Sequence, residues 1–138
     1  MSDQPMEEPA CEPQDATVVV SRTVACPIKH VWKVLMTTQG AEALLGPGAE
    51  FGQKGHTWTA QDGCSGVMRS LHPMEEIRFT LRRDGQAAPT TVELTVVPDG
   101  DTTVVRVEHS RLPLDMDLDG VKARWEAALT RIEACLAE

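Results

Sequence analysis

The clearest pattern in the chain is an alternation of apolar and polar residues over several short segments. Ile77, Phe79 and Leu81, for example, alternate with charged or hydroxyl residues. A period of two is typical of β-strands with one buried face. Strands are predicted on this basis, or from a β-branched composition, at residues 17–24, 56–61, 65–72, 76–83, 90–97 and 103–109.

Turn signals separate the later strands. Asp62 with Gly63, Asp84 with Gly85, and the run 98–101 each contain a glycine, which adopts positive φ at little cost. Pro73 ends the strand before it because proline cannot donate a ladder hydrogen bond. Consecutive alternating strands joined by short turns predict an antiparallel meander with one buried face.

Helical spacing appears in three places. Pro27 precedes apolar residues at helical intervals over 28–35, and a second short helix is predicted over 39–45. The last helix is predicted over 118–136, with Asp117 or Asp119 as its N-cap. Its apolar stripe consists of Val121, Trp125, Ala128, Leu129, Ile132, Cys135 and Leu136. A helix with such an apolar stripe must pack against another apolar surface. The buried face of the meander is the only large surface of this kind that the sequence predicts.

Charge is concentrated at the N-terminus. The 138 residues carry a formal charge of -8, and residues 1–16 hold acidic but no basic side chains. This segment has little to bury, so we expect a flexible tail at 1–16 and one domain at 17–138. The acidic balance argues against nucleic acid and against anionic membrane surfaces as partners. The segment lacks the features of a signal peptide and no apolar run is long enough to span a bilayer, so we expect a cytoplasmic protein.

The cysteines and histidines do not suggest a metal or cofactor. Cys11, Cys26, Cys64 and Cys135 are widely spaced and form no CxxC pair. Without an export signal they are expected to be reduced thiols. No cysteine and histidine group has ligand spacing, so no metal site and no cofactor are predicted.

The order of elements and several short motifs together resemble one known superfamily. The matching pieces are residues 22–27 leading into Val31 and Trp32, residues 36–38, 55–58, 62–63 and 66–67, Pro73, residues 102–103, and Trp125. The chain resembles the START-like (SRPBCC) superfamily, in particular the group that includes the C-terminal domain of the activator of the 90-kDa heat-shock-protein ATPase. The resemblance implies an α+β helix-grip fold, in which a curved antiparallel sheet of about six strands grips the last helix around a cavity.

Three positions depart from that family pattern. A tryptophan often found in the strand over 79–82 is absent, and Leu44 and Leu45 stand where the second helix often has an aromatic residue. Arg124 replaces the glycine that usually precedes the last-helix tryptophan. Such changes alter the shape of the implied cavity. The fold alone does not assign an activity, because it hosts binders, cyclases and co-chaperones.

The expected function is binding of a small hydrophobic or aromatic molecule between the sheet and the last helix. Aromatic residues make up only 4% of the chain and tyrosine is absent, so few bulky side chains are available to fill a curved sheet. Plain core packing is the alternative for the same residues. The predicted ligand-binding residues are Trp58, Met68, Ile77, Phe79, Leu81, Leu94, Val107, His109, Trp125 and Leu129.

Other functions stay open. His72 and His109 are each a candidate base at the cavity mouth or a strand-end histidine, but the sequence gives catalysis no further support. Arg69 faces the cavity if Val67 and Leu71 do, and solvent if Met68 points inward. A cyclase-like or aromatase-like enzyme is one alternative, and a co-chaperone-like module with a chaperone partner is another. The family's co-chaperone has an additional N-terminal domain, which lowers that second prospect. We expect a monomer or a weak homodimer.

Overall fold

The computed structural model describes residues 16–83 and 88–137. Its elements, in chain order, are β1 (Ala16–Val24), α1 (Ile28–Leu35), α2 (Thr38–Leu45), β2 (Thr57–Thr59), β3 (Ser65–His72), β4 (Glu76–Leu81), β5 (Thr90–Asp99), β6 (Thr102–Leu112) and α3 (Leu118–Leu136). The predicted tail falls outside the described residues except for Ala16, which begins β1. The turn expected at residues 84–85 also falls outside them. No described helix is long and apolar enough to cross a membrane.

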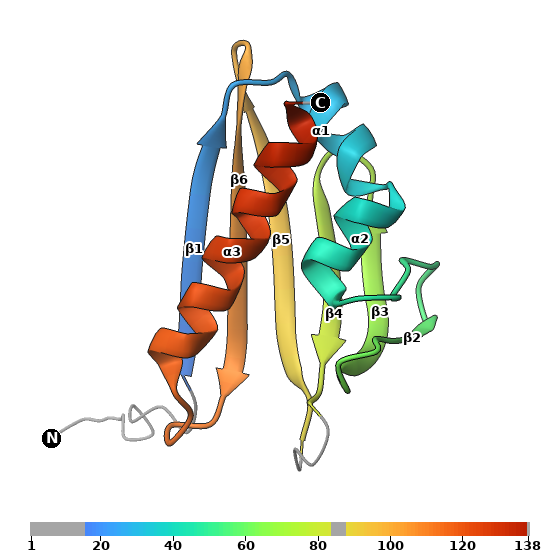
Figure 1. Cartoon of the computed structure of the whole chain (residues 1–138), viewed down its shortest axis with the longest axis vertical. Coiled ribbons are helices and arrows are strands. Elements are labelled where there is room, and N and C mark those ends of the chain that lie inside the picture. The colour runs from blue at the N-terminus through green and yellow to red at the C-terminus, as the bar shows by residue number, and fades with distance from the viewer. Residues whose placement is uncertain (1–15, 84–87, 138) are drawn as a thin grey trace, which may run out of the picture.

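The strands form one antiparallel sheet with the order β1-β6-β5-β4-β3-β2. Each strand from β2 to β6 pairs with its neighbour in the sequence, while β1 pairs with β6 at the far end of the chain. All three helices lie over the same face of the sheet, with α3 running along β1, β6 and β5 (Figure 1). The predicted helix-grip architecture is therefore confirmed.

The helices begin where polar side chains satisfy their free amides. Thr37 accepts a hydrogen bond from the backbone N–H of Gly40 at 3.1 Å and caps α2. The Asp117 carboxylate accepts a hydrogen bond from the backbone N–H of Gly120 at 3.2 Å and caps α3. Asp117 is one of the two residues predicted as the N-cap of this helix. An N-cap side chain of this kind stabilises a helix by about 1 kcal/mol.

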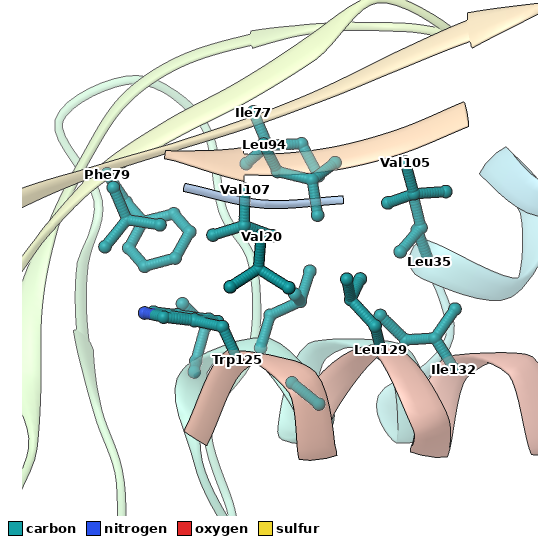
Figure 2. Close-up of a cluster of buried hydrophobic side chains, with 14 of the residues drawn as sticks. Val20, Leu35, Ile77, Phe79, Leu94, Val105, Val107, Trp125, Leu129 and Ile132 are labelled. Carbon is teal, nitrogen blue, oxygen red and sulfur yellow. The ribbon is translucent and has the colours of Figure 1, made fainter. Parts of the chain in front are cut away.

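The core lies between the sheet and α3. The apolar stripe of α3 is buried except for Cys135, which is half-buried. Figure 2 shows Trp125, Leu129 and Ile132 of α3 pointing toward side chains of the strands. The facing strand residues include Val20, Ile77, Phe79, Leu94, Val105 and Val107. Burial of this shared surface is what fixes α3 on the sheet.

A bulge interrupts the alternation in β3. Met68 pairs with Phe79 and Leu71 pairs with Ile77, so the register shifts by one residue between Met68 and Ser70. A bulge places one extra residue on one strand, which changes the face that later side chains occupy. Met68 is buried and Leu71 packs against the same core, although they are three residues apart. Arg69, between them, is exposed.

Some element boundaries differ from the predictions. β6 continues to Leu112 rather than ending at His109, because Leu112 pairs with Ala16 of β1. β2 is shorter than predicted and covers only Thr57–Thr59. The extension of β6 matters for the site, since it places His109 inside a strand.

Candidate functional site

The structure gathers the ten predicted ligand-binding residues on one side of the sheet. Each is at most 5% exposed, and they come from β2, β3, β4, β5, β6 and α3. Trp58 and Phe79 meet edge to face, with ring centroids 5.9 Å apart. The residues therefore contact one another as a packed core, and their role in ligand binding stays a prediction.

His109 is the polar member of this group, and both of its ring nitrogens are engaged. The indole N–H of Trp125 donates to Nδ1 of His109 at 2.9 Å. Nε2 must then carry the proton of the neutral ring, and it donates to the Thr90 hydroxyl at 2.7 Å. Thr90 in turn donates to the backbone carbonyl of Leu81 at 2.8 Å. This chain of hydrogen bonds ties α3 to three neighbouring strands.

The surroundings of His109 hold it in the neutral form. Burial, together with the positive charges of Arg124 and Arg83, lowers its pKa from 6.5 to about 4. While the network is intact, neither nitrogen is free to accept a proton from a substrate. His109 is thus neither the exposed strand-end residue nor the cavity-mouth base that the sequence left open.

Little open space adjoins His109. The hollow that reaches it is bordered by Leu81, Thr90, Leu112 and Arg124, among others, and holds about 10 Å³. Small-molecule sites have volumes of roughly 300–1,000 Å³. A ligand at this position would have to displace core side chains.

A much larger hollow lies beside the core. It has a volume of about 620 Å³ and is bordered by Met36, Phe51, Gly52, Gln53, Lys54, Arg69, Ser70, Leu71 and His72. We call it the edge groove. Its residues come from the C-terminal end of α1, the loop between α2 and β2, and the second half of β3. In Figure 1 these segments lie together on the side of the molecule away from β1.

Local features of the chain shape the edge groove. Phe51 and Leu71 are half-buried and pack against the core, so they give the groove an apolar floor. Gly52 carries no side chain beside the His56 ring, which a Cβ at this position would overlap. The bulge in β3 brings Leu71 to the inner side while Arg69 stays exposed. The groove therefore depends on the loop and on the bulge together.

The polar residues of the edge groove have different surroundings. Lys54 and Arg69 are exposed and make no ion pair with any described residue. His72 is also exposed, with Nε2 3.8 Å from a carboxylate oxygen of Glu76. The hydroxyl of Ser70 is buried and has no hydrogen-bond partner among the described residues. The groove thus combines an apolar floor with cationic side chains and one unused hydroxyl.

Sequence reasoning found some of these residues and missed others. It singled out Arg69 and His72, and it left the direction of Arg69 open between two alternatives. The structure has Met68 inward and Arg69 exposed. No pattern in the sequence selects Phe51 or Lys54. Phe51 is a lone aromatic residue in a glycine-rich loop, and that contrast was the only available signal.

Comparison with protein-family models identifies the family of this chain. The family model described as "Activator of Hsp90 ATPase homolog 1-like protein" matches residues 25–137. A search of functionally curated proteins gives no match. Solved structures with sequence identities of 15–23% share the fold.

Three solved structures illustrate the likeness. CalU16 from Micromonospora echinospora superposes with a TM-score of 0.74 at 20% identity, over 88% of this chain and 76% of that one. Protein MLL2253 from Mesorhizobium loti has a TM-score of 0.76 at 23% identity, over 88% of this chain and 97% of that one. The Aha1 dimer from Colwellia psychrerythraea has a TM-score of 0.72 at 15% identity, over 88% of this chain and 96% of that one. With most of its length matched by the family model, this chain belongs to the family of Activator of Hsp90 ATPase homolog 1-like proteins.

Proposed function

We propose that this domain binds a small, largely apolar molecule in the edge groove. The observation that carries the proposal is the groove itself, about 620 Å³ in volume and floored by Phe51 and Leu71. Its volume falls within the usual range for small-molecule sites, which are concave and mostly apolar with a few polar groups. The proposal keeps the predicted class of ligand and moves its position from the core to the adjoining groove.

A neutral fluorescent probe tests both the binding and the position. N-phenyl-1-naphthylamine becomes brighter in apolar surroundings, so its fluorescence reports occupancy. Phe51→Ser removes the aromatic part of the floor and should weaken binding about tenfold, equivalent to roughly 1.4 kcal/mol of lost apolar contact. Leu114→Ser is the matched control, since Leu114 is 59% exposed and lies away from the groove. Its affinity should equal that of the wild type.

A third variant separates the groove from the core. Leu94 is fully buried between the sheet and α3, and Leu94→Phe adds volume there. If the ligand occupies the groove, this variant should bind the probe normally. Loss of binding in Leu94→Phe with normal binding in Phe51→Ser would place the ligand in the core, where the sequence predicted it. An absence of saturable binding to the wild type would refute ligand binding in either place.

Protein interaction is a second candidate, favoured by the family to which the chain belongs. The description of that family refers to activation of the Hsp90 ATPase. The direct test adds purified domain to a 90-kDa heat-shock protein and measures ATP hydrolysis. Saturable stimulation that Phe51→Ser leaves unchanged would support an interaction through another surface, while no stimulation would count against this candidate.

A further inference from the structure

The charge around the edge groove is opposite to that of the whole chain. The protein has a formal charge of -8, yet Lys54 and Arg69 border the groove. Neither side chain has an ion-pair partner among residues 16–83 and 88–137. No carboxylate of the described residues occupies these two cations, so they can bind an anionic ligand.

The adjacent strand shows the contrast. Arg78 of β4 is the strand partner of Ser70 in β3. Its guanidinium forms an ion pair with the Glu93 carboxylate at 2.7 Å. Glu76 of the same strand lies 3.8 Å from both His72 and Arg78. Glu93 and Glu76 are therefore both engaged with Arg78. Arg69, one strand away, has no carboxylate partner among the residues that the structure describes, so its five guanidinium N–H donors can bind an added anion.

Ser70 adds an independent observation. Its Oγ is buried and has no hydrogen-bond partner among the described residues, although most buried polar side-chain atoms in proteins have one. Because Ser70 also borders the groove, a change of rotamer can present its hydroxyl to an acceptor bound there. An oxygen-rich anionic group would satisfy this hydroxyl and the two cations at the same time.

We propose that the edge groove selects amphipathic anions, in particular small aromatic or aliphatic carboxylates; this inference rests on the proposed function. The apolar body of the ligand lies on Phe51 and Leu71. Its carboxylate lies between Lys54 and Arg69, where the planar guanidinium can hold both oxygens. The Ser70 hydroxyl donates to the same group. The edge groove is thus a site for a charged ligand, which an apolar cavity inside the core would exclude.

A matched pair of ligands tests the charge preference directly. 1-Naphthylacetate and 1-naphthaleneacetamide share a ring and a shape, but only the first is an anion. Isothermal titration at low ionic strength should give about tenfold tighter binding of the acid. The advantage should shrink as salt is added, since exposed charges are screened.

Four variants, one of them a control, test whether the preference comes from this groove. Arg69→Gln and Lys54→Gln should each weaken binding of the acid about threefold to fivefold and leave the amide unchanged, as expected for exposed ion pairs. Lys122→Gln is the control, because Lys122 is an exposed residue of α3 away from the groove. Ser70→Ala should weaken binding of the acid without lowering the midpoint of thermal unfolding, since the hydroxyl has no partner within the described part of the chain.

The outcomes separate the two proposals. Equal affinity for the acid and the amide would overturn the anion preference and leave groove binding standing. The assignment would be refuted if Arg69→Gln and Lys54→Gln still bound the acid more tightly than the amide while Lys122→Gln did not. The anion would then bind elsewhere. If neither ligand nor the neutral probe binds, the proposed function fails as well.

Discussion

Protonation of His109 should destabilise the fold, and the structure gives the size of the effect. The folded protein holds the pKa of His109 at about 4 because the ring is buried, whereas the unfolded chain has the ordinary value of 6.5. The unfolded state therefore binds a proton first as the pH falls. The stabilisation is complete above pH 6.5, is lost progressively below it, and is gone below about pH 4. The difference in pKa corresponds to about 3 kcal/mol in total, of which about 2 kcal/mol is lost by pH 5.

The measurement compares the wild type with His109→Gln. Glutamine does not titrate, and its amide can accept from Trp125 and donate to Thr90, so the variant keeps the form of the network. The free energy of unfolding is obtained from urea titrations at pH 7.5, 6.5, 5.5 and 4.5. Taking the difference between the two proteins cancels the other titrating groups, including Glu76 and Glu93, whose pKa values shift in opposite directions.

The expected result is a stability difference that changes with pH. Between pH 7.5 and pH 4.5, the free energy of unfolding of the wild type should fall by about 2–3 kcal/mol relative to that of His109→Gln. A gap that stays constant within 0.5 kcal/mol would refute the reasoning. It would mean that His109 is either accessible to water or already released from Trp125 in the native ensemble.

Two further predictions concern the core. Trp125→Ala should lower the free energy of unfolding by about 3–5 kcal/mol, because it removes a fully buried ring and leaves Nδ1 of His109 unpaired; a loss below 1 kcal/mol in urea titration would show that α3 is not anchored there. Gly66→Ala should cost about 1–3 kcal/mol, since a Cβ would overlap the carbonyl oxygen of Thr80 and lie 2.7 Å from Nε1 of Trp58. An unchanged thermal midpoint for Gly66→Ala would contradict the close approach of β3 and β4.

The regular part of the fold could be predicted from the sequence because its signals are local and repeated. The alternation around Phe79 and the stripe around Trp125 both identify a buried face without reference to the rest of the chain. The predicted bounds of β3 and α3 coincide with the observed ones. Because one face of the sheet and one face of α3 must both be buried, the two are expected to pack against each other as layers.

The site could not be predicted in the same way. A bulge leaves no signal in an alternation pattern, so the sequence treated Met68 and Leu71 as facing opposite sides when both point inward. The loop that carries Phe51 has no period from which its position can be inferred. The spacing of His109 from Val107 predicts its face correctly, but its burial depends on neighbours that are distant in sequence: Val18 of β1, Val92 of β5 and Trp125 of α3.

The pairing of β1 with β6 has a consequence for the order in which the molecule can form. β1 is made early, but Val24 pairs with Thr103 and Ala16 with Leu112, so its ladder can close only after the meander has been synthesised. Contacts between such distant segments slow folding, because the long loop between them must close before the contacts form. Until β6 arrives, the β-branched run around Val19 is an unpaired strand that can associate with other chains. Refolding yield should therefore depend on protein concentration, and the joining of β1 to an otherwise assembled sheet is the step at which this protein is most exposed to aggregation.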